Sequence, residues 1–70
     1  MQADIKHPEV KQRLKEAGSS LVEVARELGV TASTVTIVSQ GHRMSHRVLS
    51  AIAAKLNNEP EELWPSRYED

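Results

Sequence analysis

The sequence predicts an all-α protein, a compact bundle of about five short helices that contains a helix-turn-helix. Two observations predict this class, and the length sets the number of domains. Apolar residues recur at helical spacing along nearly the whole chain. The only β-branched run, Val30–Val38, lacks the apolar–polar alternation of a strand. A chain of 70 residues holds one domain, which we place at residues 1–70 with 66–70 as a tail.

The composition restricts both the core and the class of protein. Hydrophobic residues make up 39% of the chain, Phe is absent and aromatic residues are 3%, so we expect a core of Leu, Val, Ile and Ala. A charged fraction of 27% is typical of a globular domain. The sequence contains no long apolar segment of a membrane span or signal peptide and no Cys for disulfides or cysteine-ligated zinc. We therefore expect a cytoplasmic protein.

The first two helices have clear start and stop signals. His7-Pro8 predicts the start of the first helix, because Pro is tolerated in the first turn, and Gly18 predicts its end. Its expected apolar stripe is Val10, Leu14 and Ala17. Ser20 to Glu23 predicts a reciprocal capping box at the start of the second helix, and Gly29 its end. The expected inner face is Leu21, Val24, Ala25 and Leu28.

The remaining helices follow from the same signals. Thr31 caps a predicted helix over 32–40, which Gly41 ends. Ser45 caps the next one, over 46–56. Its expected inward residues are Val48, Leu49, Ile52, Ala53 and Leu56, and Asn57-Asn58 can end it in a left-handed conformation. Pro60 begins a short fifth helix that runs through Leu63-Trp64 and ends at Pro65.

The second and third helices, joined by a short turn with Gly, have the pattern of a helix-turn-helix. This geometry needs a small residue where the helices cross, a residue that tolerates positive φ in the turn, an apolar plug and two inner stripes. Seven residues meet these requirements: Val24, Ala25, Leu28, Gly29, Val30, Val35 and Val38. The third helix is a poor helix by propensity, because it is rich in β-branched residues, so packing must hold it.

The charge distribution is compatible with a nucleic-acid partner. The net charge is −1, but residues 1–56 carry eight Lys/Arg against five acids, whereas residues 57–70 carry one Arg against five acids. The acidity therefore lies mainly at the C-terminal end, and the remainder can present a basic face to phosphates.

The chain also resembles the Ner-like regulators of transposable phages, which are small proteins with a lambda-repressor-like helical DNA-binding domain. The resemblance covers His7-Pro8, Gly18-Ser19-Ser20, the motif at Leu21–Ser39 and, most specifically, the ending Leu63-Trp64-Pro65-Ser66-Arg67-Tyr68. It implies a phage or prophage regulator, often a repressor, that binds an operator. Ser33-Thr34-Val35 matches in character, but the outer residues of the recognition helix do not transfer, so no operator sequence is implied.

The exposed side of the third helix is expected to read base edges in the major groove of double-stranded DNA. Hydroxyl groups can donate or accept, and methyl groups can contact thymine. The residues expected there are Thr31, Ala32, Ser33, Thr36, Ile37 and Gln40. A solvated helix face is the alternative for Ser33 and Thr36, and a dimer contact or core-edge packing for Ile37.

Phosphate contacts are expected from both sides of that helix. The start of the second helix offers backbone N–H groups and hydroxyls, and a basic cluster follows the third helix. The expected contacts are Ser19, Ser20, His42, Arg43, Ser45, His46 and Arg47. Arg43 and Arg47 can instead be ordinary solvated charges, and Lys6, Lys11, Arg13 and Lys15 are expected to be plain surface charge.

Other functions have weaker support. His42 and His46 have the spacing of half a zinc site, but no Cys and no carboxylate between Glu27 and Glu59 completes it, so we expect neither a metal nor a cofactor. No phosphate loop or catalytic triad is present, so we expect no enzyme. Trp64 and Tyr68 are expected to be structural, the alternatives being a dimerisation patch or a DNA contact of the tail through Arg67.

A protein-binding adaptor with the same fold, in which the neutral recognition face contacts a protein, remains the alternative function. Affinity for random duplex DNA at two salt concentrations separates the two functions. No extended dimerisation helix is present, so we expect any homodimer to be weak or assembled on DNA.

Overall fold

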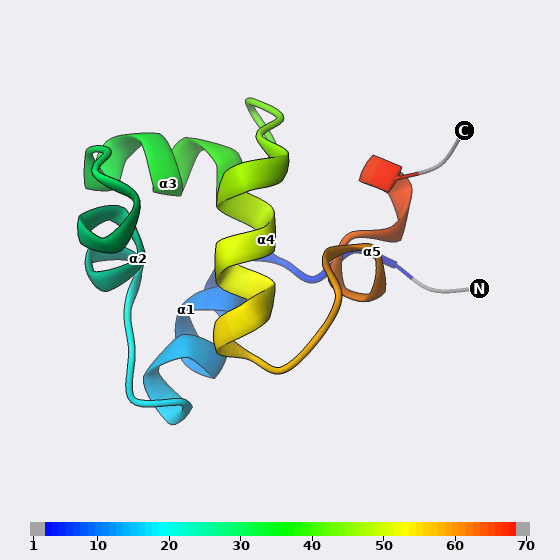
Figure 1. Cartoon of the computed structure of the whole chain (residues 1–70). Coiled ribbons are helices and arrows are strands. Elements are labelled where there is room, and N and C mark those ends of the chain that lie inside the picture. Colours follow the sequence, from blue (N-terminus) through cyan, green and yellow to red (C-terminus); the bar gives the residue numbers. More distant parts are fainter. Residues whose placement is uncertain (1–2, 69–70) are drawn as a thin grey trace.

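The computed structural model describes residues 3–68 as an all-helical bundle, which confirms the predicted fold class. These residues contain no strand. The helical elements are α1 (His7–Glu16), α2 (Leu21–Leu28), α3 (Ala32–Gln40), α4 (His46–Lys55), α5 (Pro60–Leu63) and the 3₁₀ helix η1 (Pro65–Tyr68). Figure 1 shows α4 in the middle, with α2 and α3 on one side of it and α5 and η1 on the other. None of these helices is long and apolar enough to cross a bilayer.

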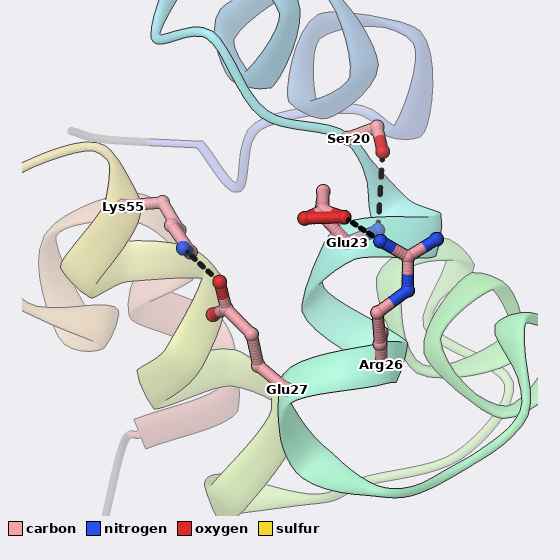
Figure 2. Close-up of polar contacts among 5 residues, drawn as sticks. All are labelled: Ser20, Glu23, Arg26, Glu27 and Lys55. Carbon is pink, nitrogen blue, oxygen red and sulfur yellow. Dashed lines mark hydrogen bonds and ion pairs between the residues drawn. The ribbon is translucent and has the colours of Figure 1, made fainter.

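Side-chain caps start three of the helices where the sequence predicts them. The Ser20 hydroxyl accepts from the backbone N–H of Glu23, Thr31 accepts from Thr34 and Ser45 accepts from Val48. Only half of the predicted capping box of α2 forms, because the Glu23 carboxylate accepts a hydrogen bond from Arg26 (Figure 2). At α5 a side chain caps in the other direction, because the Glu62 carboxylate accepts from the backbone N–H of Glu59 at 2.6 Å.

The helix ends agree with the predicted stops to within one residue. Gly29 and Gly41 adopt left-handed conformations, with φ of 72° and 92°, and Asn57 does the same with φ of 59°. Helix α4 ends at Lys55 and α5 at Leu63, each one residue earlier than predicted. Prediction of helix ends to this accuracy is expected when glycine or asparagine supplies the stop.

The core draws on all five helices and has α4 at its centre. Its buried apolar residues are Val10, Leu14, Val24, Ala25, Val35, Val38, Val48, Leu49, Ile52, Ala53, Leu63 and Trp64. The expectation of a purely aliphatic core is wrong, because Trp64 is its largest fully buried side chain. The structural role expected for Trp64 is therefore confirmed. Ala17 is exposed and lies outside the expected stripe, because α1 already ends at Glu16.

The C-terminal end differs from the sequence prediction. Ser66–Tyr68, expected as part of a tail, lie in η1, and Tyr68 packs against the core. Residues 69 and 70 of that tail lie outside the described residues. The N-terminal segment meets this end of the chain, because the N–H of Ile5 donates to the carbonyl of Leu63 at 2.9 Å. Because Trp64 is buried, the residues that directly follow it lie against the bundle.

Candidate nucleic-acid interface

Helices α2 and α3 form the predicted helix-turn-helix. Ala25 is buried between them, and its carbonyl accepts from the N–H of Val30 at 3.0 Å. Gly29 supplies the positive φ of the turn, and Val30 packs against the core. The other motif positions are buried or half-buried, namely Val24, Leu28, Val35 and Val38. The inner stripe of α3 is therefore the predicted one, and the opposite side of α3 faces outward.

The outward side of α3 carries the residues predicted to read bases. Thr36 is half-buried and the others are exposed: Thr31, Ala32, Ser33, Ile37 and Gln40. The Thr31 hydroxyl already caps the helix and lies 3.0 Å from the hydroxyl of Thr34. This surface has hydroxyl, methyl and amide groups but no charged side chain. It can hydrogen-bond base edges and contact thymine methyls, but it cannot form the bidentate Arg–guanine pair.

One side of this surface is bounded by a groove of about 370 Å³ at the start of α2. Lys11 and Lys15 line it, four positions apart on α1. The groove also contains Ser19, Ser20, Leu21, Val22, Ala32 and Thr36. From the sequence, both lysines are expected to be plain surface charges. Each follows a core residue, Val10 or Leu14, and this spacing is the signal that could have placed them on one side of α1.

The groove also contains a hydroxyl group without an internal partner. The Ser19 hydroxyl oxygen is buried, and no hydrogen bond to it exists within residues 3–68. The neighbouring Ser20 hydroxyl caps α2 and is already engaged. Buried polar atoms in proteins usually have a partner, so Ser19 has capacity for a ligand atom or a water molecule.

The other side of the surface is the loop between α3 and α4. His42 and Arg43 are exposed there, and Ser45 is half-buried as the cap of α4. Arg43 makes no hydrogen bond or ion pair within the part of the chain that the structure describes, so its guanidinium can reach an external anion. Cations thus lie at the N-terminal half of α3, where Lys11 and Lys15 line the groove, and just beyond its C-terminal end, where Arg43 is exposed.

Two predicted phosphate contacts have intramolecular partners. Arg47 donates from Nη2 to the carbonyl oxygen of Leu28 at 2.8 Å, which ties α4 to the last turn of α2. Both ring nitrogens of His46 are in hydrogen-bond range of a hydroxyl, with Tyr68 at 2.8 Å and Ser50 at 3.1 Å. Both residues remain exposed, and their role at phosphates stays a prediction. A DNA phosphate bound by Arg47 or His46 would have to share or replace these hydrogen bonds.

Helix α2 is also held from the side opposite α3. Lys55 of α4 donates to a carboxylate oxygen of Glu27 at 2.6 Å (Figure 2). Together with the Arg47 bond to Leu28, this ion pair holds α2 against α4 by two polar links. The orientation of the helix-turn-helix therefore depends on α4 as well as on the packing of α2 and α3.

The remaining candidate features are apolar surface and the histidine pair. Val22, Ile37 and Met44 are large apolar side chains that are at least 39% exposed. In residues 3–68 no three His, Asp or Glu side chains gather as a metal site would require. His46 is directed to Tyr68, with the two rings edge to face.

A comparison with protein families supports the helix-turn-helix. A family model described as "Winged helix-turn-helix DNA-binding" matches residues 4–70. No curated protein matches the sequence. A wing is a β-hairpin, and within residues 3–68 the chain that follows α4 forms α5 and η1 without a strand.

Proposed function

We propose that this chain, which belongs to the winged helix-turn-helix DNA-binding family, is a sequence-specific transcriptional regulator that reads the major groove with α3. One observation carries the proposal. Val35 and Val38 fix the rotation of α3, so that its neutral polar side faces outward, with Lys11 and Lys15 in the groove at its N-terminal half and Arg43 in the loop beyond its C-terminal end. Contacts to phosphates position such a domain on DNA, and contacts to base edges supply its sequence specificity.

Base readout is assigned to the outward side of α3. Ala32, Ile37 and the threonine methyls suit thymine methyl groups, and Gln40 suits adenine. Ser33 contributes one hydroxyl contact, which discriminates weakly. Because no Arg or Lys lies between Ala32 and Ser39, the preferred operator is read through several weak contacts to A·T-containing steps.

Phosphate contacts are assigned to both borders of that side. Arg43 is the main contact on the loop side. On the α1 side, Lys11 and Lys15 lie along the groove that leads to Ser19 and the start of α2. The backbone N–H groups in the first turn of α2 add a partial positive charge at the same place.

The biological role we propose is that of a phage or prophage repressor of the Ner-like type, acting in the bacterial nucleoid. The resemblance at the Trp-Pro-Ser-Arg-Tyr ending supports it. In this chain the ending contributes Trp64 to the core and forms η1, whose Tyr68 packs against the core. Any dimer would be weak or would assemble on DNA, because no long helix is left for an extended interface among residues 3–68.

Selection of duplexes from a random library tests the function directly. A DNA-binding regulator should enrich a recurrent site. It should also bind an unselected duplex with an affinity that falls steeply as salt rises. A protein-binding adaptor would show neither enrichment nor salt-dependent binding. Both measurements use the purified chain and synthetic duplexes.

A further inference from the structure

The last described residues form a strap across the end of the recognition helix. We define the C-terminal strap as Pro65–Tyr68. The backbone N–H of Ser66 donates to the Asp4 carboxylate at 2.9 Å, which ties the strap to the N-terminal segment. The Tyr68 hydroxyl lies within hydrogen-bond distance of His46 at the start of α4, and Arg67 donates to the carbonyl of Val38 near the end of α3. The strap therefore contacts the helices on both sides of the loop that carries Arg43.

The guanidinium of Arg67 is directed inward and lies near four groups: two carbonyls of α3, one carboxylate and one aromatic ring. Nη1 donates to the carbonyl oxygen of Val38 at 2.8 Å, and Nη2 donates to that of Ser39 at 3.2 Å. The Asp4 carboxylate lies 3.8 Å from Nε, and the guanidinium carbon lies 5.6 Å from the centre of the Trp64 ring. The side chain is only 16% exposed. A cation buried to this extent needs such partners, and the alternative of a DNA contact through Arg67 is incompatible with this orientation.

The end of α3 is capped by its own backbone, because the N–H groups of Gly41 and His42 donate to Val38 and Ile37, but no side chain of the helix adds to this cap. It has no basic residue in its last turn, and five consecutive β-branched residues, Thr34–Val38, lower its helix propensity. The last carbonyls of a helix have no intrahelical partner. Arg67 donates to the Ser39 carbonyl and adds a second donor to that of Val38, with the charge sign that a helix C-terminus favours.

The guanidinium also lies against the first residue of the loop. A Cβ atom at Gly41 would be 3.1 Å from Nη2 of Arg67. Gly41 has φ of 92°, and its N–H donates to Val38, the same carbonyl that Arg67 binds. The position of Arg67 therefore helps to define where the chain leaves α3, two residues before Arg43.

We propose that Arg67 is a positioning residue for DNA binding. Through the carbonyls of Val38 and Ser39 it sets the end of the recognition helix and the start of the loop that carries Arg43. It touches no phosphate and no base. The proposal rests on the proposed function, because it assigns Arg67 to the same DNA-binding surface.

The test uses a duplex that the wild-type chain selects from a random library and an unselected duplex of equal length. Arg67→Ala should weaken binding to the selected duplex by about two- to thirtyfold, the range for residues that alter binding without contacting the ligand. The unselected duplex should lose less, because it offers no sequence-specific contacts to lose. Any fall in the slope of log Kd against log salt should disappear when Arg43 is also replaced, because Arg67 acts on phosphates only through Arg43. Arg67→Lys should recover only part of the loss, because an ammonium lacks the planar fork that reaches two carbonyls.

The matched control is Arg13→Ala, which removes an exposed cation on α1 that pairs with Glu9. It should leave affinity and slope at the wild-type values. A slope that falls by about a further 0.9 when Arg67→Ala is added to Arg43→Ala would show that Arg67 contacts a phosphate directly and would overturn the proposal. Unchanged affinity for the selected duplex in a folded Arg67→Ala would overturn it as well.

Hydrogen exchange without DNA separates this proposal from the proposed function. In Arg67→Ala the amides of Gly41 and His42, which donate to Val38 and Ile37, should lose protection while α4 keeps it. If amides throughout Arg67→Ala lose protection, the test uses Arg67→Lys instead. Affinity of Arg67→Lys for the selected duplex between those of Arg67→Ala and the wild type supports the proposal, and wild-type affinity overturns it. If the wild type selects no duplex, the proposed function fails and positioning for DNA fails with it. The exchange result then still shows whether Arg67 holds the end of α3.

Discussion

Nδ1 of His7 lies 2.8 Å from the hydroxyl oxygen of Ser39, which joins the first residue of α1 to the last turn of α3. Ser39 is the buried polar residue of the core region, with 1% exposure. Burial lowers the pKa of His7 below its ordinary value, and the nearby positive charge of Lys11 lowers it further. The neutral imidazole is therefore the form that the folded protein favours at this contact.

This contact predicts a pH dependence of stability. The unfolded chain protonates His7 near its ordinary pKa of about 6.5, whereas the folded chain does so only at lower pH. The unfolded state then binds more protons, so the free energy of unfolding should fall as pH drops from about 7.5 to about 5.5. Urea denaturation of wild type and His7→Gln across this range measures it.

The substitution should flatten the profile, while His42→Gln, at an exposed position, should keep the wild-type slope. Equal slopes in wild type and His7→Gln would show that the contact does not carry the effect.

Overpacking at the crossing of α2 and α3 should destabilise the fold. Ala25 is 3% exposed, so Ala25→Leu adds carbons where no space is left. The expected cost is about 1–3 kcal/mol, read from urea denaturation. Ala54→Leu is the control, because Ala54 is exposed on α4 and should tolerate the larger side chain. Equal stability of the two variants would mean that the helix crossing lies elsewhere.

Arg43 and Ser33 should separate positioning on DNA from sequence readout. Arg43→Ala removes one expected phosphate contact, so it should weaken selected and unselected duplexes by similar factors and lower the salt slope by about 0.9. Ser33→Ala should leave the unselected duplex and the slope alone and cost no more than about 1 kcal/mol on the selected duplex. Binding of both variants to both duplexes at two salt concentrations measures this.

Loss confined to the selected duplex in Arg43→Ala, or equal loss on both duplexes in Ser33→Ala, would contradict these assignments. Either pattern would mean that α3 enters the groove at a rotation different from the one that Val35 and Val38 impose.

The lysines on α1 should behave as phosphate contacts despite their distance from α3 in the sequence. The double variant Lys11→Gln, Lys15→Gln should lower the salt slope by about 1.8, which is the value for two lost contacts. Stability should stay near that of the wild type, because both side chains are exposed. Arg13→Gln, on the same helix but outside this groove, is the control. A double variant with the wild-type slope would place α1 away from the phosphates.

Local signals in the sequence were sufficient for the helices and for the rotation of α3. Glycine or asparagine at the stops and Ser or Thr at the starts act within one turn, so their effect can be read without knowledge of the rest of the chain. The inner stripe of α3 follows from helical spacing, which also determined its outward side. Fold class and the candidate base-reading surface were therefore predictable.

Tertiary structure decided which charged side chains remain available for DNA. The sequence predicted Arg47 and His46 as phosphate contacts, but packing of α4 brings Arg47 to Leu28, 19 residues away, and η1 brings Tyr68 to His46, 22 residues away. Packing also placed Lys11 and Lys15 along the groove beside α2 and turned Arg67 inward onto a carbonyl 29 residues away. Helical periodicity assigns a side chain to a side of its own helix. Which distant carbonyl or carboxylate meets that side depends on how the helices pack, and packing arises from the whole core.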